Sequence, residues 1–340
     1  MRIAIVTDAW TPQVNGVVRT LECVIAELRG GGHDVLVVSP ADAPSLPCPT
    51  YPEIRLALMS PAAIGRRIAA SGAQAVHIAT EGPLGVAARR WCLSRGLPFT
   101  TAYHTQFPDY VAARTGADPE WIWRYVRWFH APAAAVLAST PTIERALNAH
   151  GLTRVRRWGR GVAPVFAPAG PRDAAMAALP GPVLLHVGRV AVEKNIAAFL
   201  SADIPGTKVV VGDGPARGAL ARQFPHAIFL GALFGADLAA AYRTADALVF
   251  PSRTDTFGLV MIEALACGTP VAAFPVPGPL DVLTPATGAM HDDLAHAITQ
   301  ALALDCAACA TAGAGFTWPA SARQFLDALE PFDTGLSRAA

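Results

Sequence analysis

The chain has 340 residues, a length typical of two domains that each bury their own core. It is 52% hydrophobic and 16% charged, with a mean hydropathy of +0.35, which excludes a disordered chain and predicts no binding to nucleic acid. The net charge is +1, but residues 1–160 hold seventeen arginines against eleven carboxylates, and the remainder is acidic. The basic first half therefore favours an anionic surface or ligand, with a solvated arginine face as the simpler alternative.

No segment predicts a membrane-spanning helix or a secretory leader. The longest charge-free stretch, Ala264 to Leu280, is interrupted by prolines and glycines and is shorter than the roughly 18 apolar residues that a span requires. Only four apolar residues precede the first polar turn, which is too few for a signal peptide. We therefore expect a cytoplasmic protein.

The six cysteines are scattered, and in a reducing compartment we expect most of them to be small buried apolar residues. Cys306 and Cys309 form a Cys-x-x-Cys pair, but no second pair of cysteines or histidines lies near them in the sequence. The sequence thus predicts neither a disulfide framework nor a metal site.

The first half alternates short, nearly all-apolar runs with helical stretches that end at glycines, such as Val17–Arg29 and Leu84–Arg95. Apolar runs of this kind are typical of parallel strands that are covered on both faces. The predicted strands are Ile3–Thr7, Val35–Ser39, Val76–Ala79, Phe99–Tyr103 and Val136–Ser139. The pattern predicts a doubly wound α/β domain over residues 1–165.

A proline-rich segment, Gly161–Pro171, predicts a linker, and a second α/β series follows over residues 172–316. Its predicted strands are Val183–Val187, Lys208–Val211, Ile228–Leu230, Leu248–Phe250 and Val271–Phe274. The fold class is therefore α/β, with two doubly wound Rossmann-like domains that face a central cleft at the carboxyl ends of their strands.

After the first predicted strand, Asn15 and Gly16 precede a helix whose N-terminal amides favour an anionic or hydroxyl-rich ligand. A plain strand-to-helix turn is the alternative, since the glycine spacing of a dinucleotide site is absent. Asp8 and Asp109 flank predicted cleft loops and are weaker candidates, for which helix capping is an equal explanation.

In the second domain, Arg189 and Lys194 follow the first predicted strand and are five residues apart. Two cations at the carboxyl end of a strand suit a diphosphate, because the guanidinium binds in a bidentate manner and the ammonium neutralises growing charge. The chain has only two lysines, so a lysine in this position is informative. A surface arginine and a lysine at a helix start are the alternative.

The most specific segment runs from Asp255 to Glu263 and is followed by Ala-Leu-Ala-Cys-Gly-Thr-Pro-Val. A turn is expected to open a helix at Phe257, with the amides of Phe257, Gly258, Leu259 and Val260 pointing at an anion. If the segment is helical, the two carboxylates are two turns plus about 80° apart and border the same cleft. A capping aspartate with a surface glutamate is the alternative.

These pieces resemble the retaining glycosyltransferases of the GT-B class known as family 4, and the resemblance covers nearly the whole chain. The matching segments are Asn15-Gly16-Val17, Tyr103-His104-Thr105, Arg160-Gly161-Val162, Gly188-Arg189 with Lys194, Gly212-Asp213-Gly214, and Asp255 to Val271. Family 4 usually has glutamate where this chain has Asp255, which retracts the carboxylate by one methylene, and aspartate where it has Ala163.

The resemblance implies a role for each matching residue. Arg189 and Lys194 would hold the diphosphate of the donor, with Gly16 and the amides of the Phe257 turn. Glu263 would bind the nucleotide ribose, Asp255 the transferred hexose, and His104 the hexose near the reacting carbon. Asn15, Gly16 and Tyr103 would bind the acceptor. The family's C-terminal helix, here Trp318–Leu329 within residues 318–330, would cross back onto the first domain.

The implied reaction moves a hexosyl group from a UDP- or GDP-sugar to a hydroxyl and keeps the anomeric configuration, with the leaving phosphate as base. The sequence lacks an Asp-x-Asp motif, so a metal-independent reaction without a cofactor is expected, in which Arg189, Lys194 and helix amides replace a divalent ion. A nucleotide-sugar epimerase, a phosphorylase and a non-catalytic nucleotide-sugar-binding protein are the alternatives.

The acceptor is predicted from residues 119–130, where five aromatic rings and two arginines occupy one helical stretch. Such a helix suits a membrane interface, and a buried aromatic core is the alternative. The segment around Trp10 is similar to bacterial enzymes that glycosylate diacylglycerol. We therefore expect a lipid acceptor and peripheral attachment to the inner face of an anionic membrane, through a few of Arg66, Arg67, Arg89, Arg90, Arg124 and Arg127. Arg95 and Arg114 add to the basic excess of this half. A soluble or polysaccharide acceptor stays open, as does the oligomeric state.

Overall fold

The structure is a computed structural model that describes residues 1–13, 15–48, 51–104 and 118–333. The chain divides into two compact units. Unit 1 comprises Met1–Gly159 and the chain from Trp318 onward, and unit 2 comprises Arg160–Thr317. Asp109 and Arg114, which the sequence singled out, lie outside the described residues.

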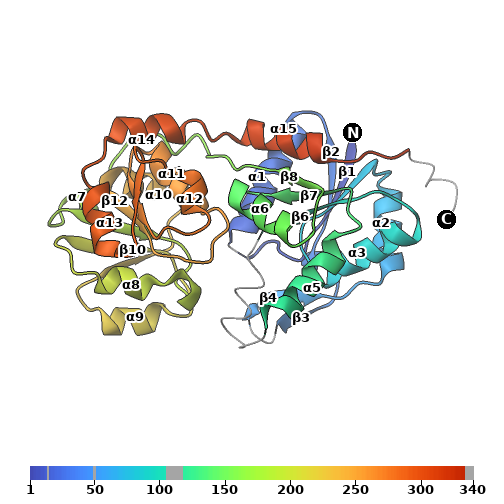
Figure 1. The fold of residues 1–340 in the computed structure, drawn as a ribbon, viewed down its shortest axis with the longest axis horizontal. Coiled ribbons are helices and arrows are strands. Elements are labelled where there is room, and N and C mark those ends of the chain that lie inside the picture. The colour runs from blue at the N-terminus through green and yellow to red at the C-terminus, as the bar shows by residue number, and fades with distance from the viewer. Residues whose placement is uncertain (14, 49–50, 105–117, 334–340) are drawn as a thin grey trace. The chain divides into compact units, whose positions relative to one another are not determined.

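Unit 1 is built on a six-stranded parallel sheet (Figure 1). Its strands stand in the order β2-β1-β5-β6-β7-β8. They are β1 (Arg2–Val6), β2 (Asp34–Val38), β5 (Ala75–Ile78), β6 (Thr100–Tyr103), β7 (Ala135–Ala138) and β8 (Val155–Arg157). The central strands are buried on both faces, which explains their continuous apolar runs.

Helices cover both faces of this sheet, with α1 packed on α15 and α2 packed on α3 (Figure 1). The helices are α1 (Gly16–Gly30), α2 (Pro61–Ala70), α3 (Pro83–Ser94), α5 (Pro119–His130), α6 (Pro141–Ala149) and α15 (Trp318–Ala328). A two-stranded antiparallel sheet, β3 (Ser45–Cys48) with β4 (Tyr51–Ala57), accompanies them. The C-terminal helix α15 therefore belongs to the N-terminal unit.

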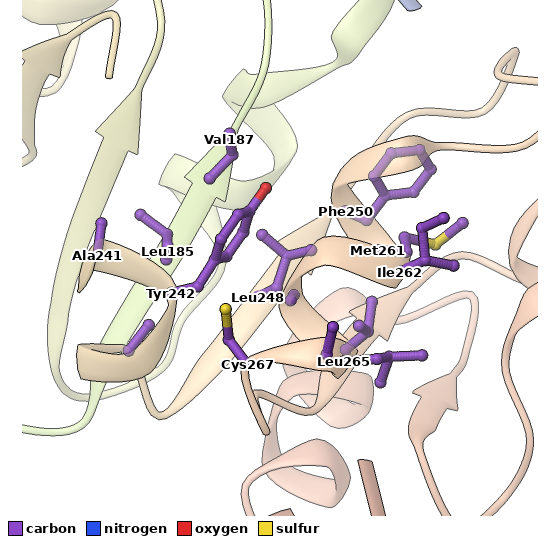
Figure 2. Packing of buried hydrophobic residues seen from close by; sticks show 14 of the residues in the cluster. Leu185, Val187, Ala241, Tyr242, Leu248, Phe250, Met261, Ile262, Leu265 and Cys267 are labelled. Carbon is purple, nitrogen blue, oxygen red and sulfur yellow. The ribbon is translucent and has the colours of Figure 1, made fainter. Parts of the chain in front are cut away.

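Unit 2 repeats the architecture with strands in the order β11-β10-β9-β12-β13-β14. The strands are β9 (Val183–Val187), β10 (Thr207–Val211), β11 (Ile228–Gly231), β12 (Ala247–Phe250), β13 (Val271–Ala273) and β14 (Gly288–Met290). The helices are α7 (Ala174–Ala177), α8 (Ile196–Ser201), α9 (Arg217–Gln223), α10 (Gly235–Thr244), α11 (Leu259–Ala266), α12 (Pro279–Val282), α13 (Leu294–Ala301) and α14 (Cys306–Gly313). One apolar core joins β9, β12, α10 and α11 (Figure 2).

Each sheet has one point where the strand order reverses. In unit 1, β2 lies on one side of β1 and β5 on the other, so the order reverses between β1 and β5. In unit 2, β10 lies on one side of β9 and β12 on the other, so the order reverses between β9 and β12. The helices that follow such a pair of strands lie on opposite faces, so the loops between them diverge and leave room for a ligand. We call these two places the switch points of unit 1 and unit 2.

The predicted α/β class and all ten predicted strands are confirmed to within about one residue. The sequence did not reveal β3, β4, β8 or β14. Among the described residues, no single helix is long and apolar enough to cross a membrane, although α13 and α14, bent by 97°, pass that test together. The described residues also contain no group of three or more metal-ligating side chains.

Candidate donor site

Two tightly packed loops form the base of the switch point in unit 2. The loop after β9 pairs with the loop after β10, because Val190 N–H donates to the Asp213 carbonyl at 2.8 Å. Gly212 has φ 138°, and a Cβ there would lie 1.8 Å from the Gly188 carbonyl oxygen. A side chain at residue 212 would therefore push apart the loop that carries Arg189 and Lys194.

The structure brings Lys194 and Asp255 into direct contact. Lys194 Nζ donates to Asp255 Oδ1 at 2.7 Å and to Oδ2 at 2.9 Å, which joins the loop after β9 to the loop after β12. Each side chain is 24% exposed, so the pair lies at the surface of the switch point. The resemblance assigned the donor diphosphate to Lys194 and the transferred hexose to Asp255. The hydrogen bonds between the two side chains show that each also orients the other.

The charge of Lys194 governs the ionisation of Asp255. Burial alone would raise the pKa of this carboxyl, but the Lys194 charge and hydrogen bonds outweigh burial and lower the pKa below its ordinary value of 3.8. The nearby His186 is buried, and its Nδ1 lies 3.2 Å from the Val249 carbonyl oxygen. Burial, with a smaller effect of the Lys194 charge, lowers the pKa of His186 to about 4. The contact between Lys194 and Asp255 thus brings a cation and a carboxylate together close to a buried imidazole.

Arg189 lies in the same loop and is partly exposed. Its Nη1 is 3.8 Å from Glu193 Oε1, four residues further along the chain. The side chains of Arg189 and Glu193 are 28% and 14% exposed, so both are only partly accessible. Arg189 and Lys194 thus belong to one loop, as the sequence predicted.

Helix α11 begins later than predicted. It starts at Leu259 after Gly258, which has φ 84° and whose Cβ would lie 2.9 Å from the Phe250 ring. Asp255 therefore lies in the loop before the helix, so the angular separation predicted for a continuous helix does not apply to Asp255 and Glu263. The Phe257 side chain is buried, so this residue contributes only its backbone to the turn, while the first amides of α11 are those of Leu259 and Val260.

Glu263, on α11, is held by a residue that the sequence did not reveal. The Tyr242 hydroxyl donates to Glu263 Oε2 at 3.0 Å. Tyr242 is fully buried, and burial raises its pKa well above 10. Figure 2 shows its ring beside Leu185 of β9 and Leu248 of β12, with the hydroxyl oxygen at the Val187 end. The carboxyl end of β9 is the end that carries the site, so Tyr242 fixes the Glu263 carboxylate on that side.

The candidates in unit 1 lie at its carboxyl edge but differ in accessibility. Asn15 caps α1, and its Oδ1 accepts the amides of Val17 and Val18 at 3.0 Å each. Gly16 is exposed. Tyr103 is 2% exposed and stacks on Trp123, so its ring belongs to the core. His104 follows β6 and is partly buried, with Trp158 at its ring edge.

Asp8 serves the fold of unit 1. Its Oδ1 accepts the amide of Leu84 at 2.8 Å, and its Oδ2 accepts the amide of Gly85 at 3.2 Å and the Thr80 hydroxyl at 2.9 Å. The side chain thus caps α3 from the end of β1 and is buried. Burial raises its pKa despite these hydrogen bonds. Capping, one of the two alternatives for Asp8, is the role that the structure supports.

The predicted helix over residues 119–130 is confirmed as α5. One face of this helix is buried in the core and the other is exposed. Trp123 and Phe129 are buried, whereas Trp121 is 66% and Trp128 42% exposed. The Arg124 guanidinium lies 4.8 Å from the Trp121 ring centroid. The exposed face of α5 thus carries aromatic rings with an arginine between them.

The arginines of unit 1 do not all face solvent, which corrects the expectation from the sequence. Arg89 is buried and donates to the carbonyls of Trp128 at 2.6 Å and Phe129 at 3.0 Å, so it caps the end of α5. Arg67 pairs with Asp42 at 2.9 Å, and Arg127 pairs with Glu120. Arg66, Arg90, Arg95 and Arg124 are exposed.

Two sequence families match this chain. Residues 14–166 match Glycosyltransferase Family 4, and residues 181–304 match Glycosyl transferases group 1. A GDP-mannose-dependent alpha-mannosyltransferase from Mycolicibacterium smegmatis is 34% identical over 319 residues, 86% of this chain and 84% of that protein. An alpha-monoglucosyldiacylglycerol synthase from Streptococcus pneumoniae is 28% identical, over 89% of this chain and 78% of that protein.

Solved structures agree on the fold. Sucrose-phosphate synthase from Thermosynechococcus elongatus superposes with a TM-score of 0.76 and 22% identity, over 96% of this chain and 97% of that protein. The protein HepE of Anabaena, solved with UDP-glucose, gives a TM-score of 0.70 and 16% identity, over 96% and 98%.

These findings define a GT-B glycosyltransferase that uses a nucleotide sugar. The chain belongs to glycosyltransferase family 4.

Proposed function

We propose that this enzyme transfers a mannosyl group from GDP-mannose to a hydroxyl of a membrane lipid such as diacylglycerol, with retention of configuration and without a metal ion. The observation that carries the proposal is the contact between Lys194 and Asp255 at the switch point of unit 2. A cation suited to a diphosphate and a carboxylate suited to sugar hydroxyls meet there, as a nucleotide sugar requires.

The choice of donor is supported by relatives. Proteins described as GDP-mannose-dependent alpha-mannosyltransferases from three species are 29% to 34% identical to this chain. GDP-mannose is itself an α-linked donor, so an enzyme that makes α-mannosides from it retains the configuration. The same donor and the same stereochemistry are proposed here.

In the proposed reaction, the bond between the anomeric carbon and the β-phosphate oxygen breaks while the acceptor oxygen attacks from the same face. The acceptor proton moves to the departing phosphate oxygen, and the products are GDP and the mannoside. Arg189, Lys194 and the first amides of α11 stabilise the charge that grows on the diphosphate. These groups take the role that a divalent ion would otherwise fill.

The remaining roles follow the chemistry of each side chain. Glu263, fixed by the Tyr242 hydroxyl, binds the ribose hydroxyls of the nucleotide, since an ionised carboxylate accepts from two hydroxyls. Asp255 binds hexose hydroxyls while it orients Lys194. His104 is the proposed contribution of unit 1 to binding of the hexose.

Thermal denaturation with a panel of donors tests the choice of nucleotide sugar. A ligand that binds only the folded state stabilises it by RT ln(1 + [L]/Kd), about 2.7 kcal/mol at one hundred times Kd. GDP-mannose should raise the melting temperature more than GDP-glucose, UDP-glucose and GDP. A larger shift with UDP-glucose would mean that UDP-glucose, and not GDP-mannose, is the donor. The absence of a shift with every nucleotide sugar would contradict binding of a donor.

The lipid acceptor is supported by the exposed face of α5. Trp121 and Trp128 are amphipathic rings typical of a membrane interface, and Arg124 lies between them in sequence. Each arginine near an anionic surface contributes about 1 kcal/mol, so a few of them give reversible attachment. The relative from Streptococcus pneumoniae, by its name, makes a glucosyldiacylglycerol.

Co-sedimentation with vesicles tests this surface. Binding should increase with the anionic lipid content and weaken at high salt, because charges are screened beyond about 8 Å at physiological ionic strength. Trp121→Ala with Trp128→Ala and Arg124→Glu should each reduce binding, while Phe234→Ala and Arg222→Glu, exposed positions of unit 2, should not. Transfer of the hexosyl group to a soluble sugar, without binding to vesicles, would contradict the lipid acceptor. The assignment as a glycosyltransferase would not be affected.

A further inference from the structure

The switch point of unit 1 holds a partly exposed carboxylate, that of Glu81, which contacts the core through only one of its oxygens. Glu81 follows β5 and precedes α3, at the carboxyl edge of the sheet and beside the loop after β1. Its side chain is 22% exposed. The topology makes this loop the counterpart of the loop that carries Asp255 in unit 2.

The surroundings of Glu81 hold it in one position. His130 Nε2 lies 3.2 Å from Glu81 Oε1, and His130 Nδ1 lies 2.8 Å from the Thr101 hydroxyl. Because an ionised carboxylate only accepts hydrogen bonds, Nε2 carries the proton of this contact. The Tyr125 hydroxyl donates to the Glu81 carbonyl. The His130 side chain is fully buried, so the carboxylate is anchored to the core of unit 1.

Asp8, the other carboxylate of this switch point, is not equivalent. Both of its oxygens are engaged by the start of α3 and by Thr80, and the residue is 7% exposed. Glu81 is oriented through one oxygen and through its backbone, while part of its side chain reaches solvent. A buried imidazole that anchors a partly exposed carboxylate is an arrangement suited to hydroxyl groups.

We propose that Glu81 binds a hydroxyl group of the acceptor, with His130 as its positioning residue. The inference rests on the proposed function and names the acceptor group that this function requires. The ligand chemistry is an alcohol or a vicinal diol, as offered by glycerol, by a sugar or by the head group of a lipid. A carboxylate accepts from such hydroxyls through short, charge-assisted hydrogen bonds.

Binding of the acceptor without turnover is the first test. Isothermal titration uses methyl α-mannoside as the soluble probe and neutral vesicles that contain diacylglycerol as the lipid probe. The wild type should bind at least one of them, and Glu81→Gln should bind it about tenfold more weakly, because the amide keeps the size and loses the charge. A wild type that binds neither probe, or an equal affinity in the variant, would overturn the inference.

Steady-state kinetics supply the second test and separate acceptor from donor. Glu81→Gln should raise KM for the acceptor about tenfold and leave KM for the donor within about twofold, and Glu81→Asp should be intermediate. Glu144→Gln is the matched control, since it removes a glutamate of α6 in unit 1 that pairs with Arg157 of β8. Equal increases in both KM values would indicate a general structural effect and overturn the assignment. A donor shift on melting that persists in Glu81→Gln would show that the donor half of the proposed function is independent of this result.

Discussion

The two switch points have the same topology but differ in how deeply their polar residues are buried and in the partners of those residues. In unit 2, Lys194 and Asp255 join the two loops and remain 24% exposed. In unit 1, Asp8 joins the two loops through the amides of α3 and is buried. Topology therefore places polar residues at both positions, but burial decides whether they serve a ligand or the fold.

The physical reason lies in the partner of each carboxylate. Asp255 meets a lysine, a mobile cation that can bind a phosphate as well as a carboxylate. Asp8 meets backbone amides, which are fixed and would be left without acceptors if the carboxylate turned away. Substitution of Lys194 or Asp255 should therefore impair catalysis, and substitution of Asp8 should impair stability.

The largest effect is expected for the cations of unit 2. Lys194→Ala and Arg189→Ala should each lower kcat by about 10²–10³, and much more than they weaken donor binding, because both are proposed to face charge that grows in the transition state. Single-turnover rates and donor titrations measure the two quantities. Arg222→Ala, an exposed arginine of α9, is the control and should match the wild type. Equal losses in binding and turnover would contradict the role.

The stability of unit 2 should depend on pH through His186. Burial lowers its folded-state pKa from 6.5 to about 4, so between these values the unfolded state binds the proton more strongly. The free energy of unfolding should therefore fall as the pH falls from 6.5 to about 4, by about 1.4 kcal/mol per pH unit, with no further loss from this group below that.

The control for this dependence is a substitution that keeps the hydrogen bond. His186→Asn can still donate to the Val249 carbonyl and should remove the contribution of His186, while His226→Asn, at an exposed site, should retain it. Urea denaturation across this pH range measures the slope. An unchanged slope in His186→Asn would assign the pH dependence to other groups.

At the unit 1 switch point, Asp8→Ala should destabilise the fold by about 1–3 kcal/mol, because the amides of Leu84 and Gly85 lose their buried acceptor. Chemical denaturation measures the change. At a temperature where the variant is folded, its KM for the donor should equal that of the wild type. A stable variant with impaired donor binding would mean that the two switch points are alike after all.

Tyr242→Phe should have a smaller effect, confined to the donor. Loss of one hydrogen bond to Glu263 costs about 1–1.5 kcal/mol, which corresponds to an increase in donor KM of about five- to tenfold. KM for the acceptor should stay the same. A fall in kcat with unchanged KM for the donor would place Glu263 in the chemical step instead.

The smallest effect is expected from removal of metal ions. Activity should persist in excess EDTA, because Arg189, Lys194 and the amides of α11 are proposed to neutralise the diphosphate. Rates measured with EDTA and then with added Mg²⁺ or Mn²⁺ check this. Complete loss that a divalent ion restores would contradict the metal-free reaction.

Local patterns in the sequence determined much of this protein. Apolar runs fixed the strands, and glycine at residue 258 indicated the turn before α11, because burial on both faces and positive φ angles restrict residue type locally. The sequence also identified Arg189, Lys194, Asp255 and Glu263 as chemically distinctive. It placed the start of α11 two residues too early, at Phe257, since helix propensity alone does not show that Phe257 and Gly258 belong to the preceding loop.

Only the tertiary structure decided which of these groups meet. Asp255 is 61 residues from Lys194, and Tyr242 is 21 residues from Glu263, so neither contact follows from local spacing. Glu81 stands between a predicted strand and Gly82-Pro83, a position that the sequence could have indicated, but its anchor His130 is 49 residues away. Strand order sets which loops are neighbours. Burial then decides whether a carboxylate serves only the fold, as that of Asp8 does, or remains accessible to a ligand, as that of Asp255 does.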